Sequence, residues 1–224
     1  MSIKIINLNK LLRLCMLQEN GLIAELRTDL RTERNKKLGK KTGGGHFQYP
    51  WWTAAKDHTI GASDLEEQTL FLIEKNPKQR KRLYPQLTSG FLKWLNHIRR
   101  STNLDLDWQN EEVHTHYVVP ELELTVKVDN LLALTLGGDH HKLIYPYFSE
   151  TPALSERWAR VGLWLMGEAL SDFDLTCMEI LDVIKGRSFA GSEIYLKGDE
   201  GSLFSLRYSA IMELWESLKP EYDL

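Results

Sequence analysis

Residues 121–148 carry the clearest pattern in the chain, an alternation of apolar and polar side chains with a period of two. The even positions of the first half are apolar except at Asn130, and the odd positions change from charged to apolar at Leu131 and Ala133. This pattern is typical of a strand that begins at the rim of a sheet and ends covered on both faces. We therefore predict one long strand, a turn at the glycine pair 137–138, and a returning strand.

Helical periodicity dominates the first hundred residues instead. Apolar residues recur there at spacings of three and four. Residues that favour helix starts precede several of these runs, among them Asn7 and the capping box formed by Ser63 and Glu66. Three glycines at 43–45 separate two helical stretches. The pattern predicts helices over residues 8–17, 22–41, 50–60, 64–76 and 89–100.

Strand and helix signals alternate in the second half of the chain. Thr151 and Pro152 have the residue types of a helix cap and a first helical turn, and an almost wholly apolar helical run follows them. The closing helix carries apolar residues that we expect to face inward, Leu206 included. In addition to the hairpin, the pattern predicts strands at 113–119, 178–184 and 192–197, and helices at 154–170 and 199–218.

These elements together predict a mixed α+β fold. A helical and basic N-terminal half, residues 1–102, leads through a connection at 103–112 into an acidic α/β region at 113–224. We expect a sheet of four to five strands, built on the long hairpin and flanked by helices. The two halves are expected to pack as one compact unit.

Composition places the chain among soluble globular proteins. It has 224 residues, of which 42% are hydrophobic and 26% charged. Its apolar N-terminus is too short to span a bilayer, so we expect a cytoplasmic protein without a membrane partner. Cys15 and Cys177 lie far apart and form no CxxC pair, which excludes a disulfide framework and a zinc knuckle. No Walker or Rossmann glycine motif is present, and we expect no cofactor.

Charge is divided unequally between the two halves. Residues 1–100 contain 19 Lys and Arg against 9 Asp and Glu, whereas residues 101–224 contain 9 against 22. Such an asymmetry indicates either a nucleic-acid surface on the basic half or two faces that pair within a chain, with a second copy or with a protein partner. Composition leaves both interpretations open.

Aromatic residues are interleaved with the basic runs of the first half. Lys and Arg can neutralise phosphates while tryptophan rings stack on bases, so the pattern is typical of nucleic-acid binding. The alternative is that the basic residues are solvated helix ends and the tryptophans fill the core. The candidate contacts are Lys36, Lys37, Lys40, Lys41, Trp51, Trp52, Lys78, Arg80, Lys81 and Arg82.

Histidines gather around the predicted hairpin. His114 and His116 alternate on a predicted strand, and Asp139, His140 and His141 follow the glycine turn. Imidazole and carboxylate groups suit a first-row metal ion. The same residues are also ordinary turn formers beside two glycines, and no further ligand spacing supports a metal site.

Acidic residues of the second half form another candidate set, with Asp129, Glu150 and Glu179 as potential magnesium ligands and Lys142 beside them. The order of elements over residues 113–185 resembles the core of the PD-(D/E)XK nuclease fold. That resemblance implies a metal-binding acid and a catalytic lysine two residues apart on the returning strand. Pro146 and Phe148 stand at those positions, so the resemblance implies a nuclease-like core without its catalytic pair.

The whole chain also resembles a set of uncharacterised bacterial proteins through three motifs, GGGHFQYPWW, KRLYPQL and IYPYFSE. That resemblance implies a shared family and carries no implication for mechanism. The sequence thus favours a non-catalytic module that binds nucleic acid or a protein partner. An assembly subunit that pairs its basic and acidic halves, and a divalent-metal hydrolase or nuclease, are the alternatives.

Overall fold

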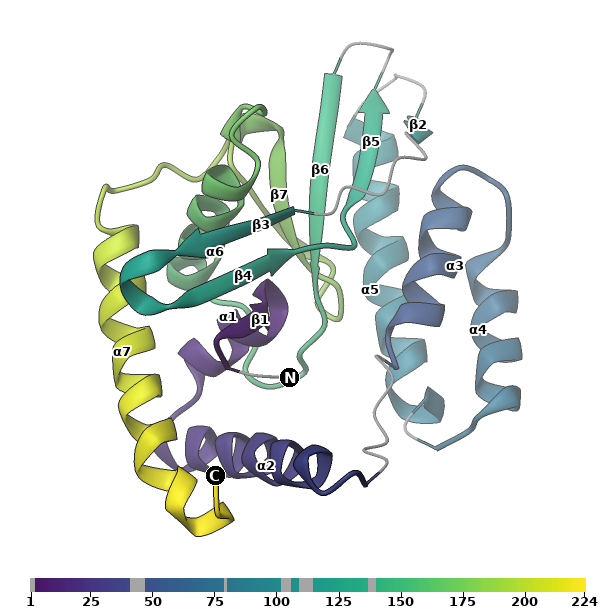
Figure 1. Ribbon diagram of the computed structural model, residues 1–224. Helices are drawn as coiled ribbons and strands as arrows, with labels where there is room; N and C mark the ends of the chain where they lie inside the picture. Colours follow the sequence, from purple (N-terminus) through teal and green to yellow (C-terminus); the bar gives the residue numbers. More distant parts are fainter. Residues whose placement is uncertain (1–2, 41–46, 79, 102–105, 109–114, 137–139) are drawn as a thin grey trace.

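The computed structural model describes residues 3–40, 47–78, 80–101, 106–108, 115–136 and 140–224, without the side chains of 106–108 and 140. The predicted α+β class is confirmed, with a helical N-terminal half followed by sheets and helices (Figure 1). No helix among these residues has the length and apolar character needed to cross a bilayer. The glycine run 43–45 and the turn at 137–138 lie outside the described residues.

Five helices make up most of the first half. Asn7 caps the first one as predicted, because its side-chain oxygen accepts a hydrogen bond of 2.9 Å from the Lys10 amide. The helices are α1 (Leu8–Met16), α2 (Glu19–Lys37), α3 (Tyr49–Thr59), α4 (Leu65–Lys75) and α5 (Arg80–Ser101).

In the described part of the chain, eight strands form two sheets. The smaller sheet has the order β1-β4-β3 and comprises β1 (Ile5–Asn7), β3 (Thr115–Val119) and β4 (Leu124–Val128). The larger has the order β2-β5-β6-β7-β8 and comprises β2 (Leu106–Trp108), β5 (Leu132–Leu136), β6 (His140–Tyr147), β7 (Met178–Asp182) and β8 (Arg187–Ala190). Helix α6 (Glu156–Ala169) connects the parallel pair β6 and β7, and α7 (Glu200–Leu218) follows β8.

Two hydrophobic clusters cover opposite faces of the larger sheet. On one face, α1, α2, α6, α7 and the small sheet pack against side chains such as Tyr145 and Ile180. On the other, α3 and α5 pack against Leu134, Ile144 and Leu181. Neighbouring residues of one strand point to opposite faces, so β6 and β7 contribute to both clusters.

The predicted long strand is broken into two strands that belong to different sheets. Asn130 has a φ of 62°, a left-handed conformation that ends β4 and redirects the chain into β5. The returning strand is confirmed, since β5 and β6 pair antiparallel from Leu132 with Ile144 to Leu136 with His140. The alternating pattern hides this break because both strands keep a period of two.

Several predicted boundaries in the first half are wrong. Asp64, and not Ser63, caps α4 by accepting a bond of 2.9 Å from the Glu67 amide. Helix α5 begins nine residues before its predicted start and runs through Pro85. The predicted connection at 103–112 contributes β2, and the rest of it apart from 106–108 lies outside the described residues.

Three predictions in the second half are also wrong. Helix α6 begins at Glu156 after Ser155, so Thr151 does not cap it. Residues 192–197 form a turn and coil, and the last strand is β8, which begins at Arg187. Leu206, predicted to face inward, is 74% exposed.

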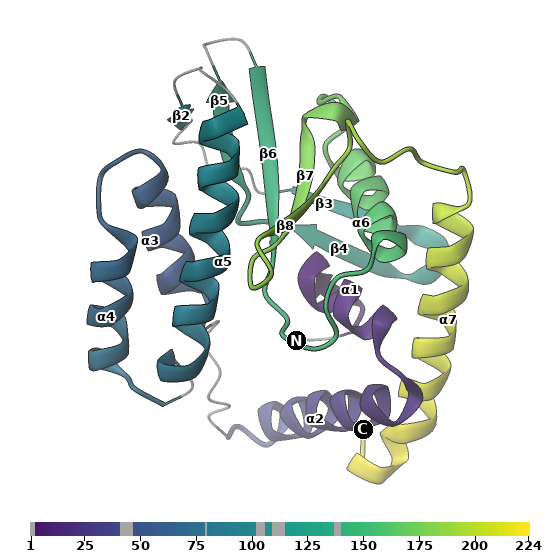
Figure 2. The same cartoon turned by 180° about the vertical axis from the view of Figure 1, so that it is seen from behind.

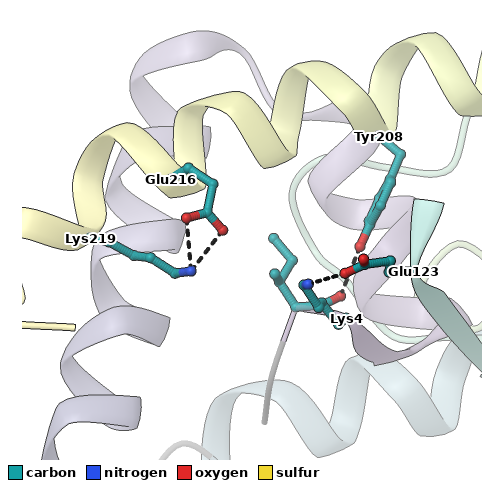
Figure 3. A network of polar contacts seen from close by, with 6 residues as sticks. Lys4, Glu123, Tyr208, Glu216 and Lys219 are labelled. Carbon is teal, nitrogen blue, oxygen red and sulfur yellow. Dashed lines mark hydrogen bonds and ion pairs between the residues drawn. The ribbon is translucent and has the colours of Figure 1, made fainter. Parts of the chain in front are cut away.

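Polar contacts fix the N-terminal segment between the small sheet and α7 (Figure 3). Lys4 forms an ion pair with Glu123, and the Tyr208 hydroxyl donates a hydrogen bond of 3.3 Å to the Ile3 carbonyl. Near the end of α7, Lys219 donates to both carboxylate oxygens of Glu216 at 2.7 and 2.8 Å. The first strand is thereby held beside β4, with which it pairs in parallel.

Candidate nucleic-acid interface

Helix α5 is the most cationic element of the described structure. Its 22 residues include six Lys and Arg and no Asp or Glu. Tyr84, Leu87, Phe91 and Leu95 are buried against the larger sheet and α3. The opposite face of α5 is exposed or half-buried. Its residues follow one another at helical spacing and are Arg82, Gln86, Ser89, Lys93, His97 and Arg100.

The middle of α5 lies directly against the turn between β7 and β8. A side-chain carbon added at Gly90 would lie 2.0 Å from the Val183 carbonyl oxygen, so only glycine permits this approach. Gly186, at the tip of the turn, has a φ of 57° and faces the Gly90 carbonyl in the same way. Figure 2 shows β8 running beside α5. The close packing brings Lys185 and Arg187, both exposed, to the side of the helix.

A groove of about 670 Å³ runs between α5 and this turn. We call it the α5 groove, and it is lined by Lys93, Trp94, Asn96, His97, Arg100, Gly186, Ser188 and Glu193. Its ionisable lining is mostly basic, with Glu193 as the single acid. Neither Lys93 nor Arg100 forms an ion pair with a residue that the structure describes. The groove therefore presents cationic side chains to an anionic ligand.

Trp94 of the groove is held in place by a buried ion pair. Its indole nitrogen donates a hydrogen bond of 2.6 Å to Oε1 of Glu179, and Lys142 Nζ lies 3.0 Å from Oε2 of the same carboxylate. Glu179 is 2% exposed, so each of its oxygens depends on these partners. These contacts join β6 and β7 to α5, and they give Lys142 and Glu179, two of the candidates named above, a structural role.

The other two catalytic candidates lie elsewhere. Asp129 follows β4 and lines a separate pocket with Tyr145, which points to the opposite face of the larger sheet from Glu179. Glu150 is exposed and accepts two hydrogen bonds from Arg82, which lower the pKa of its carboxyl group. The structure therefore does not bring Asp129, Glu150 and Glu179, the candidate magnesium ligands, together at one site.

The histidine candidates are likewise dispersed. His116 is exposed on β3 of the small sheet, whereas His141 lies on β6 of the larger one, 3.5 Å from the Thr135 hydroxyl. Within the part of the chain that the structure describes, no group of three or more His, Cys, Asp or Glu could hold a metal ion. His114, Asp139 and the side chain of His140 are outside that part.

Of the predicted nucleic-acid contacts, the two tryptophans are wrong as stacking surfaces. Trp51 and Trp52 are 0% and 2% exposed and contact the rings of Phe91 and Phe148, so they fill the core. Arg80 lies over the Tyr84 ring and donates to the Leu72 carbonyl at 3.3 Å. Exposed cationic candidates are Lys36, Lys37, Lys40, Lys78, Lys81 and Arg82, while Lys41 lies outside the described residues.

Among the described residues, four ion pairs join the basic half of the chain to the acidic half. They are Lys4–Glu123, Arg27–Glu221, Arg34–Asp223 and Arg82–Glu150. The charge asymmetry of the sequence is thus partly balanced inside one molecule. The groove cations Lys93 and Arg100 take part in none of these four pairs.

Comparisons with protein-family models, curated proteins and solved structures find no match for this chain. The nuclease resemblance stays a prediction, as does the resemblance to bacterial proteins. The α5 groove was missed from the sequence because Lys185 and Arg187 join Lys93 and Arg100 only through the fold. One signal was present, since no acid occurs between Glu74 and Asp105.

Proposed function

We propose that the protein binds nucleic acid through phosphate contacts in the α5 groove and along the exposed face of α5. One observation carries the proposal. Helix α5 contains no acid, and its cations Lys93 and Arg100 line a groove without forming an ion pair with any described residue. Lys and Arg that neutralise phosphates supply most of the affinity of non-specific binding. An overall net charge of −3 makes the location of the cations matter more than their total number.

The dimensions of α5 support a polymeric ligand. Arg82 and Arg100 mark the ends of the exposed face, and 18 residues of helix between them span about 27 Å. A duplex carries one phosphate charge per about 1.7 Å of its axis, so several phosphates fit along this face. Lys185 and Arg187 widen the cationic strip on one side of the helix. A small anion would use only part of such a strip.

Matched charge reversals test the proposal. The groove variant carries Lys93→Glu and Arg100→Glu in the groove and Arg187→Glu beside it, and the control carries Lys36→Glu, Lys37→Glu and Lys40→Glu near the end of α2. Both change the net charge by the same amount at exposed positions. Affinity for a fluorescent single-stranded oligonucleotide is measured by anisotropy between about 50 and 200 mM salt.

We expect the groove variant to bind about tenfold more weakly or worse at low salt, and its salt slope to fall by about two units for three lost contacts. The control should stay within about twofold of the wild type. Equal losses in the two variants, or no measurable binding by the wild-type protein, would overturn the proposal. Circular dichroism of each variant confirms that the fold is retained.

A further inference from the structure

A second, smaller pocket of about 50 Å³ lies where the chain passes from the small sheet to the large one. Among the described residues that line it, four are aromatic, Tyr49, Trp52, Tyr145 and Phe148, and Asp129 is the only one with a charge. We call it the Asp129 pocket. None of these lining residues is Lys, Arg or His, so their charge has the opposite sign to that of the α5 groove.

The backbone of this pocket adopts a costly conformation that three hydrogen bonds maintain. Asn130 is left-handed, with a φ of 62°. The Trp52 indole donates a hydrogen bond of 2.8 Å to the carbonyl oxygen of Asn130. The side-chain amide of Asn130 donates to the Tyr49 hydroxyl and to Oδ1 of Asp129, the latter at 3.2 Å. These contacts hold Asp129 beside the aromatic rings.

Two polar groups are directed into the pocket with part of their hydrogen-bonding capacity unused. Tyr145 is 3% exposed, and its hydroxyl oxygen accepts a bond of 2.8 Å from the Asn9 amide. No acceptor for its O–H and no partner for Oδ2 of Asp129 occurs among the described residues. Burial raises the pKa of Tyr145, and the nearby charge of Asp129 raises it further. A ligand with positive charge would complement this arrangement.

We propose that the Asp129 pocket binds a small organic cation, an ammonium or methylated ammonium group. A carboxylate gives a charge-assisted hydrogen bond to an ammonium group, and aromatic faces attract cations through their quadrupoles. Calcium ions take about six to eight oxygen ligands, and magnesium ions need a near-octahedral set in which waters remain bound, whereas this pocket offers one carboxylate among aromatic rings. An anion would be repelled by Asp129. The site is independent of the α5 groove.

The Trp52 indole N–H provides a local readout because it is bonded to Asn130 at the pocket. Methylammonium chloride and tetramethylammonium chloride are titrated into ¹⁵N-labelled protein, with sodium chloride and potassium chloride at equal ionic strength as references. We expect a saturable shift of the Trp52 indole resonance with at least one organic cation and none with the inorganic salts. Assignment follows from the loss of that resonance in Trp52→Phe.

Two variants separate recognition from folding. Asp129→Asn removes the charge and should abolish the shift, whereas Glu150→Gln removes an exposed carboxylate outside the pocket and should retain it. The Trp94 indole, bonded to Glu179 on the other face of the sheet, reports whether each variant is folded. Equal shifts with the inorganic salts, no shift with either organic cation, or an unchanged shift in a folded Asp129→Asn protein would overturn the proposal.

Discussion

Helices α5 and α7 lie on opposite sides of the larger sheet and use their charged residues differently (Figure 1). In α7, Arg207 donates to the carbonyls of Cys15 and Leu17 at 3.0 and 2.7 Å, and Glu200 pairs with the buried Arg160. In α5, Lys93 and Arg100 form no such contacts with described residues. Arg207 and Glu200 of α7 hold the fold together, whereas Lys93 and Arg100 of α5 remain available to a ligand.

The largest expected effect concerns the buried ion pair between Arg160 and Glu200 at the start of α7. Arg160→Met leaves the carboxylate of Glu200, which is 2% exposed, with its backbone amide donors but without its cationic partner. Breaking a buried ion pair in this way costs about 3–5 kcal/mol, which we expect to see as a lower free energy of unfolding in urea. Lys219→Met, which removes a more exposed pair at the other end of α7, should cost about 1 kcal/mol or less. Similar losses for the two variants would contradict the structural role given to Glu200.

A smaller effect is expected where α5 meets the turn between β7 and β8. Gly90→Ala places a carbon against the Val183 carbonyl and should destabilise the protein by about 1–3 kcal/mol. It should also weaken oligonucleotide binding, because Lys185 and Arg187 move away from the helix. Gly167→Ala is the control, since its added carbon first meets Leu175 at 3.7 Å. That change should stabilise α6 by up to about 1 kcal/mol and leave binding unaltered.

The pH dependence of the unfolding free energy tests the contribution of Glu200 separately. Burial alone would raise the pKa of its carboxyl group, but hydrogen bonds from the amides of Lys197 and Gly198 and from Arg160 lower it overall. The stabilising contribution is therefore present above the unfolded pKa, about 4.3, and is lost as the pH falls through the folded pKa. Asp182 changes the pH dependence of stability in the opposite direction, because burial raises the pKa of its carboxyl group.

The difference in unfolding free energy between wild type and Glu200→Gln removes contributions that both proteins share, including that of Asp182. We expect this difference to shrink as the pH is lowered below about 4. Urea unfolding at several pH values measures it. A difference that stays constant across the acidic range would show that Glu200 does not carry the depressed pKa.

The smallest effect concerns the only acid of the α5 groove. Glu193→Gln removes a repulsive charge beside Lys93 and Arg100, so we expect affinity for an oligonucleotide to rise by about two- to threefold at low salt. Glu213→Gln on α7 changes the net charge equally and should alter affinity by less. Anisotropy titrations compare the two variants, and an identical response would indicate that binding follows net charge alone.

The elements that the sequence predicts well are those with strong local signals. Asn7 caps α1, β7 lies within the strand predicted at 178–184, and α7 begins one residue after the Asp199 expected at its start. The errors arise where tertiary contacts decide. The left-handed Asn130 moves β5 into another sheet, and Pro85 is accommodated inside α5 because the surrounding helix packs against the sheet.

The candidate sites were harder to predict than the fold. Glu179 was a candidate magnesium ligand with Lys142 beside it, and in the structure their contact positions Trp94. The α5 groove and the Asp129 pocket both combine residues from distant segments, which no spacing rule in the sequence connects. Only the absence of acids around α5, and the change from charged to apolar residues near Asp129, were visible beforehand.

Chemical-shift mapping tests most directly whether α5 is the ligand-binding helix. A single-stranded oligonucleotide is titrated into ¹⁵N-labelled protein at low salt. We predict the largest amide shifts at residues 93–100 and 185–188, together with the Trp94 indole, and small shifts throughout α7. Shifts centred on residues 31–40 or on α7, with the α5 groove unchanged, would contradict the assignment.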